Sequence, residues 1–372
     1  MIVIGGGVAG TSCAYHLARG GAQVLLVERT ALAAASSGRS AAFIETQYTE
    51  PDRIRMCVHG RRLYGHLHET FGIDFQVRGK LLLGRSTEER SGFESSLRLQ
   101  RELGADDASI LEHDELVARF PSLVFDRDEF ALYGPDDGYL DPVALCHAYA
   151  HAAARAGATI RVSSQVDGLD ALAFGYQVHT DRETLSADAL VIAAGAWTQQ
   201  LAAMLDLPVP IGGYRRQVTL LEVSGINTQP LLVDPNTRAG CLYFRDDGPG
   251  RILAGLHSEK RNDGATHDPD HYKRSADPEL GSRVRDLTRR RLQGGGQVRL
   301  GGGWAGLYPI SRDGRFVLGE SKHRPAVFFC AGLAGNGIQL SAAAGEIIAQ
   351  LVRDGHQTLL PDLTPYTPDR FL

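Results

Sequence analysis

The sequence predicts an α/β fold in which a parallel sheet, formed by both ends of the chain, carries an antiparallel insertion. Apolar runs from Ile2 to Val27 follow the strand, helix and strand order of a parallel β-α-β unit. The pattern changes over residues 208–256, where short apolar runs are separated by turns and helical spacing is nearly absent. Strand and helix patterns return over residues 327–352. These three observations predict α/β and antiparallel parts in one chain.

Length and composition limit the class of protein. The chain has 372 residues, enough for two domains at about 150 residues per domain. Hydrophobic residues are 43% and charged residues 22%, which excludes disordered and fibrous chains. The net charge of −5 argues against a nucleic-acid partner, and no apolar run reaches the about 20 residues of a transmembrane segment. The five cysteines are scattered and no signal peptide is visible, so we expect a cytoplasmic protein. The histidines are also scattered, so we expect no metal site.

Helix and strand patterns can be placed in order along the chain. Helices are predicted over residues 8–19, 87–103, 142–155, 279–292 and 339–352. Asp141 and Pro142 mark a clear start, because Asp is a good N-cap and Pro fits the first helical turn. Strands of the α/β part are predicted over residues 2–4, 23–27, 159–162, 189–193 and 327–330. Strands of the insertion are predicted over 81–83, 218–223, 231–233, 242–245 and 252–256, and a loop over 262–278.

A glycine motif between the first strand and the first helix carries the clearest chemical signal. Gly5 permits a tight turn, Gly7 lets the backbone approach a pyrophosphate, and Gly10 lets the helix pack close to the sheet. Free N–H groups at the helix start attract phosphates. Glu28 ends the second strand, where an acid accepts ribose hydroxyls. The combination predicts a Rossmann-type dinucleotide-binding domain rather than a glycine-rich turn alone.

Three later segments favour FAD over a nicotinamide cofactor. Residues 36–42 form a loop of mostly small residues, residues 189–195 form an apolar strand that ends in a glycine, and residues 332–338 repeat the order of glycine loop and helix. A long cofactor that touches both ends of the chain explains all three segments. Each segment taken alone also fits a tight turn between a strand and a helix.

On these residues the sequence resembles the flavin-dependent D-amino-acid oxidase superfamily, which includes glycine oxidase, sarcosine oxidase and D-amino-acid dehydrogenases. The motifs that carry the resemblance span nearly the whole chain: VIGGGVAG (3–10), SSGRSAA (36–42), DGYLDP (137–142), VIAAGAW (191–197), WAGL (304–307), DG (313–314) with Gly319, and GLAGNGIQ (332–339). The resemblance implies a glutathione-reductase-like FAD-binding domain over residues 1–79, 136–204 and 301–372. It implies an inserted antiparallel substrate-binding domain over residues 80–135 and 205–300.

The resemblance also implies how FAD is held. The implied cofactor-binding residues are Gly5, Gly7, Gly10, Glu28, Arg29, Ser36, Ser37, Gly38, Arg39, Ser40, Val166, Gly195, Trp197, Gly332, Gly335, Asn336, Gly337 and Ile338. Some relatives bind FAD covalently through a His in the early loop or a Cys near the position of Gly306. This chain has no His between residues 17 and 58, and Cys330 lies in a predicted buried strand, so we expect non-covalent FAD.

The activity implied by the resemblance is oxidation of the C–N bond of an amino acid or amine by hydride transfer to flavin N5, followed by hydrolysis of the imine. A flavoenzyme acting on a 2-hydroxy acid, and a flavin subunit of a larger electron-transfer complex, are the alternatives. The electron acceptor, O2 or a quinone or dye, and the oligomeric state stay open. Lys260 is a candidate charge near the flavin, or a solvated surface lysine. Tyr48 matches a substrate-contacting family position, or is a half-buried aromatic at a domain seam.

Recognition of the substrate's acid group departs from the family pattern. In glycine oxidase and the D-amino-acid dehydrogenases, an Arg that pairs with the substrate carboxylate follows the WAGL-like segment. Here that position holds Tyr308, which has one donor and no charge. Neighbouring strand residues face opposite sides, so one of Arg215 and Arg216 is expected to point inward. We expect Arg216 to recognise the acid group with Tyr308 adding a hydrogen bond, and Arg245 is a further candidate. The alternative is a substrate without a small α-carboxylate.

Overall fold

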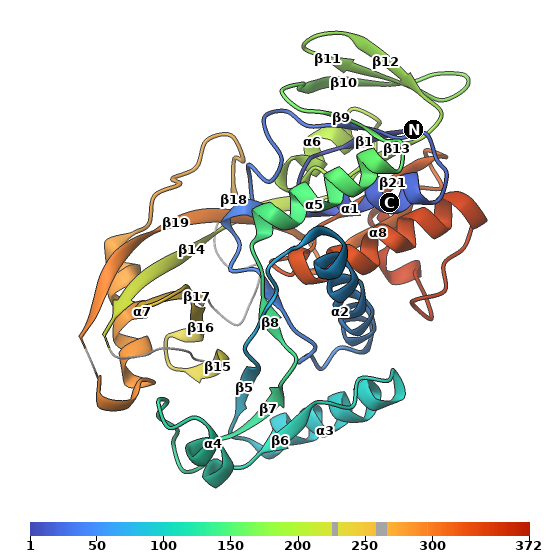
Figure 1. Ribbon diagram of the computed structural model, residues 1–372. Helices are drawn as coiled ribbons and strands as arrows, with labels where there is room; N and C mark the ends of the chain where they lie inside the picture. The colour runs from blue at the N-terminus through green and yellow to red at the C-terminus, as the bar shows by residue number, and fades with distance from the viewer. Residues whose placement is uncertain (225–229, 258–265, 296) are drawn as a thin grey trace.

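A computed structural model describes residues 1–372 except 225–229, 258–265 and 296, and it separates the chain into a mostly parallel α/β part and a mostly antiparallel part (Figure 1). The α/β part contains a six-stranded sheet in the order β20-β21-β13-β1-β2-β9. Its strands are β1 (Ile2–Ile4), β2 (Leu25–Val27), β9 (Thr159–Arg161), β13 (Leu190–Ile192), β20 (Val317–Glu320) and β21 (Val327–Ala331). Only the β20–β21 pair of this sheet is antiparallel.

Both faces of the six-stranded sheet are covered, as a parallel sheet requires. Helices pack on one face, around an apolar core rich in alanine: α1 (Val8–Arg19), α2 (Pro51–Phe71), α5 (Pro142–Arg155) and α8 (Gly337–Asp354). The opposite face meets α6 (Thr198–Ala203) and a small antiparallel sheet of β10 (Val166–Ala171), β11 (Tyr176–Thr180) and β12 (Thr184–Ala187). The glycine turn after β1 is therefore held in place by buried structure on both sides.

The second part is a nine-stranded, mostly antiparallel sheet. Its order is β18-β14-β17-β16-β15-β5-β7-β6, with β19 paired to β14, and only β15–β5 is parallel. Its strands are β5 (Lys80–Gly84), β6 (Ser109–Leu111), β7 (Phe130–Gly134), β14 (Ile211–Val223), β15 (Leu231–Thr237), β16 (Gly240–Asp246), β17 (Arg251–His257), β18 (Thr266–His267) and β19 (Val298–Ser311). The helices of this part are α3 (Thr87–Glu102), α4 (His113–Arg119) and α7 (Pro278–Arg290).

The two parts are joined near the middle of the molecule. A three-stranded sheet of β3 (Phe43–Ile44), β8 (Gly138–Tyr139) and β4 (Gln76–Val77) lies in the segments that connect them. The long pair β14–β19 runs from the antiparallel part back toward the α/β part, where Ile211 pairs with Ser311 (Figure 1). The base of this pair thus lies beside the strands that carry the glycine loops.

The predicted mixture of parallel α/β and antiparallel structure is confirmed. The five predicted helices correspond to α1, α3, α5, α7 and α8, and the strands predicted over 218–256 lie within β14–β17. β19 has no counterpart among the predicted elements, because its Gly301, Gly302 and Gly303 interrupt the apolar alternation. In the predicted loop 262–278, residues 262–265 lie outside the described residues, and Thr266–His267 pairs with β14 as β18.

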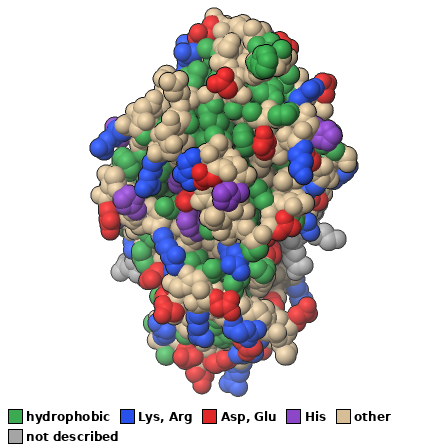
Figure 2. Space-filling view, turned by 90° about the vertical axis from the view of Figure 1, so that its right-hand side faces the viewer, with side chains coloured by type: hydrophobic (Ala, Val, Ile, Leu, Met, Phe, Trp, Pro, Cys, Tyr) green, Lys and Arg blue, Asp and Glu red, His purple; other side chains and the backbone are tan. Residues whose placement is uncertain are grey.

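Charges of both signs are intermixed on the face shown in Figure 2, where Lys and Arg side chains lie beside Asp and Glu side chains. Among the residues that the structure describes, no helix is long and apolar enough to cross a membrane.

Candidate active site

A cavity of about 530 Å³ lies between the glycine loops of the six-stranded sheet and the β14–β19 pair. Residues from both ends of the chain line it, together with residues of the antiparallel part. The predicted cofactor-binding residues that line it are Gly5, Gly7, Glu28, Arg29, Ser36, Ser37, Arg39, Ser40, Val166, Gly195, Trp197, Gly332, Gly335, Gly337 and Ile338. Two of the predicted substrate residues, Arg216 and Tyr308, line the same cavity.

The glycine loop leaves no room for side chains. A Cβ on Gly10 would lie 1.9 Å from the carbonyl oxygen of Gly5, so α1 approaches the strand end as closely as backbone allows. Glu28 closes the loop from the second strand: one carboxylate oxygen accepts from the Gly6 N–H at 2.6 Å, and the other from the Thr30 N–H at 2.9 Å. A carboxylate and a helix N-terminus therefore face one end of the cavity, as ribose and phosphate binding require.

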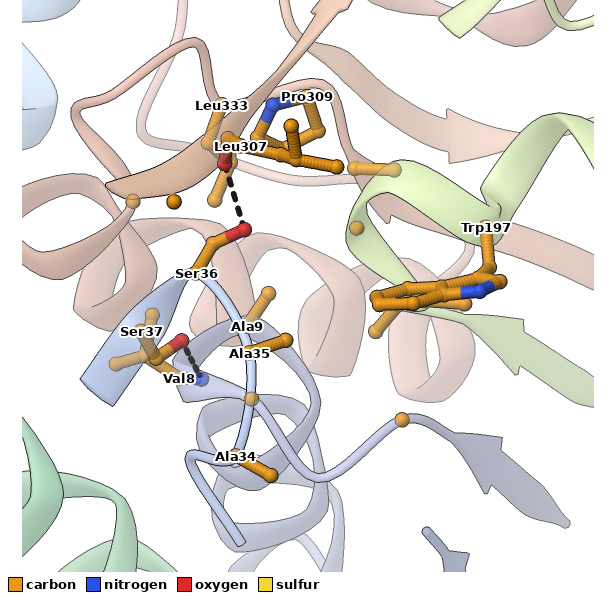
Figure 3. Close-up of a pocket in the computed structure, with 18 of the residues that line it drawn as sticks. Val8, Ala9, Ala34, Ala35, Ser36, Ser37, Trp197, Leu307, Pro309 and Leu333 are labelled. Carbon is orange, nitrogen blue, oxygen red and sulfur yellow. Dashed lines mark hydrogen bonds between the residues drawn. The ribbon is translucent and has the colours of Figure 1, made fainter. Parts of the chain in front are cut away.

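The loop of residues 36–40 contacts both the start of α1 and the strand β19. Ser37 Oγ accepts from the Val8 N–H at 3.0 Å, at the start of α1, and Ser36 Oγ donates to the Leu307 carbonyl at 2.6 Å (Figure 3). The indole N–H of Trp304 also donates to the Arg39 carbonyl at 2.9 Å. Two of these contacts join the loop near residue 37 to β19 near residue 305, and the third joins it to the start of α1.

The cavity fits FAD, judged by its polar groups. The hydroxyl of Ser164 is buried, lines the cavity and has no hydrogen-bond partner among the described residues. Ser164 lies beside Glu28 in space, because the Glu28 carbonyl accepts the Ser164 N–H at 2.9 Å. It precedes Val166, another cavity residue, by two positions in the chain. A buried hydroxyl without a partner is costly unless a ligand completes it. Ser164, Glu28 and the N-terminus of α1 supply polar groups for an adenosine diphosphate.

Three side chains from three strands form the roof of the cavity, defined here as Arg216, Tyr243 and Tyr308. The guanidinium carbon of Arg216 lies 5.9 Å from the centroid of the Tyr308 ring. Burial and the neighbouring Tyr308 hydroxyl, with which it hydrogen-bonds, raise the pKa of Tyr243 well above its ordinary value. Gly335 has a φ of +81°, and a Cβ there would lie 2.4 Å from the Tyr308 ring, so the ring packs against the loop before α8.

The neighbouring arginines point elsewhere. Arg215 faces away from the cavity and pairs with Asp277 at 2.7 Å. Arg245 is buried, and its guanidinium donates to the carbonyls of Ala41 and Asp246 at 2.8 and 2.6 Å. Of the three candidate arginines, the cavity is lined by Arg216 alone. Lys260 lies outside the described residues.

Sequence reasoning missed Tyr243. Leu242 and Phe244 are fully buried in the core of the antiparallel part, so the period of two places Tyr243 on the opposite face. That alternation was visible in the sequence, but nothing local indicated that this face meets Tyr308.

Four predicted site residues do not line the cavity: Gly10, Gly38, Asn336 and Tyr48. Gly10 and Gly38 support the loops, since a Cβ on Gly38 would lie 2.4 Å from the Ala33 carbonyl oxygen. Asn336 is the N-cap residue of α8, and its side-chain oxygen lies 3.3 Å from the Tyr48 hydroxyl. Tyr48 therefore lies beneath the cavity rather than along its wall.

A buried polar cluster surrounds Tyr48. Its hydroxyl donates to Glu45, and Glu45 forms an ion pair with Lys80, which is 2% exposed. Asp137 is fully buried nearby and accepts from the Gln47 amide at 2.5 Å. Burial raises the pKa of Asp137 to about 7, despite the opposing charge of Lys80. The Tyr48 hydroxyl of the cluster contacts the Asn336 side chain at the start of α8, whose Gly337 lines the cavity.

The fold and the cavity define an α/β dinucleotide-binding protein with an antiparallel roof. Residues 1–351 match the model of the DAO family, described as FAD dependent oxidoreductase, and the chain belongs to this family. It is an FAD-dependent oxidoreductase, and the predictions of the family and of FAD as cofactor are confirmed.

The sequence identities to individual relatives are low. The chain is 26% identical to glycine oxidase of Geobacillus kaustophilus, over 100% of this chain and 96% of that protein. It is 26% identical to monomeric sarcosine oxidase of Bacillus sp. strain B-0618, over 95% of this chain and 92% of that protein. The structure of L-proline dehydrogenase from P. horikoshii superposes with a TM-score of 0.88 at 24% identity, covering 100% of this chain and 96% of that one, and shows the shared fold.

Proposed function

We propose that this FAD-dependent oxidoreductase binds its substrate's acid group at Arg216, with Tyr243 and Tyr308 beside it in the roof of the cavity. Oxidation of an amino-acid or amine C–N bond, the predicted activity, is confirmed by the family and its glycine oxidase and sarcosine oxidase members. The single observation that carries the proposal is the convergence of the three roof side chains on one cavity shared with the glycine loops.

We further propose a division of the chain into two domains. A Rossmann-type, glutathione-reductase-like domain of residues 1–79, 136–204 and 301–372 holds FAD. A substrate-binding domain of residues 80–135 and 205–300 supplies Arg216 and Tyr243 of the roof, and Tyr308 comes from the third segment of the FAD-binding domain. The parallel β1–β2 pair with its glycine turn, and the antiparallel β14–β17 strands, support this division.

FAD, when bound, supplies the two-electron oxidation by accepting a hydride from the substrate carbon. The chain's own residues bind and orient. Arg216 offers a planar fork of donors that suits a carboxylate. The raised pKa of Tyr243 keeps its hydroxyl protonated even above the ordinary range of a tyrosine, so it is a neutral hydrogen-bonding group in the site. The start of α8 at Gly337 lines the cavity, and its free N–H groups favour negative charge there.

The remaining cofactor contacts are proposed for the residues that line the cavity. Glu28 and Val166 would face the adenosine, the start of α1 the pyrophosphate, and the loop of Gly335 and Ile338 the ring. We propose that FAD is held without a covalent bond. Position 306 is a glycine, so no thiol stands there, and a Cβ built on it would lie 3.2 Å from the Arg39 side chain. Acid precipitation tests this: colour that stays with the pellet contradicts it.

Replacement of Arg216 tests the substrate proposal. We expect Arg216→Ala to lower kcat/KM for acid-bearing amines by about tenfold to a hundredfold, the loss of a charge-assisted pair. Uncharged amines should be much less affected. Arg251→Ala is the matched control, because Arg251 lies on β17 of the same sheet, its side chain is 57% exposed, and it does not line the cavity.

The assay is anaerobic bleaching of the flavin with D-amino acids, N-methyl amino acids, uncharged amines and 2-hydroxy acids. Unchanged turnover of every acid-bearing substrate in Arg216→Ala contradicts the assignment and favours a substrate without a small α-carboxylate. Reoxidation of the bleached enzyme by O2 or by a quinone then identifies the electron acceptor. The cytoplasmic location stays a prediction.

A further inference from the structure

A loop of the antiparallel part reaches across to the cofactor end of the cavity. We call residues 268–274 the strap. Both ends of the strap rest on the β14–β19 pair: Thr266–His267 pairs with Gly213 and Tyr214 on one side, and the Arg274 carbonyl accepts from the Ala305 N–H at 2.8 Å on the other. Between these ends, Asp270, Tyr272 and Arg274 line the same cavity as the glycine loop.

The tip of the strap contacts two elements of the α/β part. Asp270 Oδ1 accepts from Arg29 Nη1 at 2.6 Å and from the Trp197 indole N–H at 3.1 Å. The guanidinium carbon of Arg29 also lies 4.5 Å from the centroid of the Trp197 ring. Arg29 directly follows the ribose-facing Glu28, and Trp197 closes the short helix after β13. These three mutual contacts form a latch, defined as Arg29, Trp197 and Asp270.

The base of the strap is held more firmly than its tip. Arg215 donates to the carbonyls of Lys273 and Ser275 at 2.8 Å each, and pairs with Asp277 at 2.7 Å. The Arg215 side chain is only 14% exposed, whereas those of Arg29 and Asp270 are 33% and 38% exposed. Exposed ion pairs are screened and weak, so the latch is the part of the strap that opens most easily.

We propose that the strap retains the cofactor: the latch holds residues 268–274 across the cavity, and its opening sets the rate at which FAD leaves. The latch joins Asp270, from the antiparallel part, to Arg29 and Trp197, which line the cavity at its cofactor end. The strap also presents the positive charge of Arg274 to a cavity that takes a diphosphate-bearing cofactor. This proposal concerns retention of FAD and holds whichever substrate the roof accepts.

The rate of FAD release tests the latch. The holoenzyme is diluted strongly, and free FAD is followed by its fluorescence over time. We expect Asp270→Asn to release FAD about twofold to fivefold faster, because it loses its exposed ion pair with Arg29. Asp270→Glu keeps the charge and should restore much of the slow release. Higher ionic strength should accelerate release in the unmodified protein more than in Asp270→Asn.

Glu183→Gln is the matched control. It removes the Arg161–Glu183 pair, which has the same 2.6 Å separation and similar exposure, 31% and 48%, but lies outside the cavity. Release at the unmodified rate in Asp270→Asn, or equal acceleration in Glu183→Gln, overturns the proposal. If Asp270→Asn yields no folded holoenzyme, the salt series decides: a release rate of the unmodified protein that does not change with salt overturns it.

Discussion

The two ends of the cavity are built in different ways. At the cofactor end, Gly5, Gly10 and Glu28 lie within one β-α-β unit. Gly10 packs against the Gly5 carbonyl, and the Glu28 carboxylate accepts from the N–H of the adjacent Gly6. At the roof, Arg216 and Tyr308 come from strands almost a hundred positions apart, aligned by the β14–β19 register in which Arg216 faces Gly306. The cofactor end therefore depends on local backbone geometry, and the roof depends on strand register.

The largest effect is expected from the local geometry of the cofactor end. Gly10→Ala places a Cβ 1.9 Å from the Gly5 carbonyl oxygen, and only a shift of α1 or of the loop relieves this contact. We expect little or no folded, FAD-loaded protein, measured by soluble yield and by the ratio of flavin to protein absorbance.

Gly65→Ala is the control for that change. Gly65 also lies in a helix, but nothing lies within 4 Å of a Cβ built there. It should stabilise the protein by about 0.5–1 kcal/mol, because alanine favours the helix. Full flavin occupancy in Gly10→Ala would show that the cofactor end tolerates movement of α1.

A smaller effect is expected where the two ends meet. Gly335→Ala places a Cβ 2.4 Å from the Tyr308 ring at a residue with φ of +81°. We expect the ring to be displaced, kcat/KM to fall about tenfold, and stability to fall by about 1–2 kcal/mol from the positive φ.

Gly314→Ala separates backbone strain from contact with the ring. Its φ of +75° is similar, yet nothing lies within 4 Å of the added Cβ. It should lose comparable stability and keep its turnover. Equal losses of kcat/KM in both variants would mean that Tyr308 packing does not matter for turnover.

The last expected effect is a change in the pH dependence of stability, from the cluster beneath the cavity. Burial raises the pKa of Asp137 to about 7, whereas an unfolded Asp titrates near about 4. Between these values the native state binds more protons than the unfolded state, so the Asp137 contribution to the unfolding free energy falls as pH rises from about 4 to about 7. Asp137→Asn should remove this slope from a plot of Tm against pH.

The Asp137 prediction is tested by comparing the plot of Tm against pH for Asp137→Asn with the plot for the unmodified protein. His16 is buried with its pKa lowered to about 4, so it acts with the opposite sign: the native state binds fewer protons, and stability rises between about pH 4 and 6.5. His16 contributes to both curves and cancels in the difference. Parallel curves for the two proteins between pH 4 and 7 would contradict a raised Asp137 pKa.

Much of the cofactor end was readable from the sequence. The spacing of Gly5, Gly7 and Gly10 predicts a turn and a helix start whatever the rest of the chain does, because these are local backbone requirements. The alternation rule also restricted Arg215 and Arg216 to opposite faces, and the structure places Arg216 at the cavity. In contrast, Arg245, a candidate of the same residue type, is occupied by backbone carbonyls of its neighbours in space.

By itself, the sequence determined five of the helices, the β1–α1–β2 unit, the strands within β14–β17, the glycine loops and the family, but not α2 or β19. Tertiary structure alone decided that Tyr243 meets Tyr308, that Tyr48 lies in a buried cluster with Glu45 and Lys80, and that Asp270 reaches Arg29. The physical reason is the range of the interactions. Turns and helix starts depend on neighbouring residues, whereas these contacts depend on which distant strands pair and in which register, and no short segment carries that information.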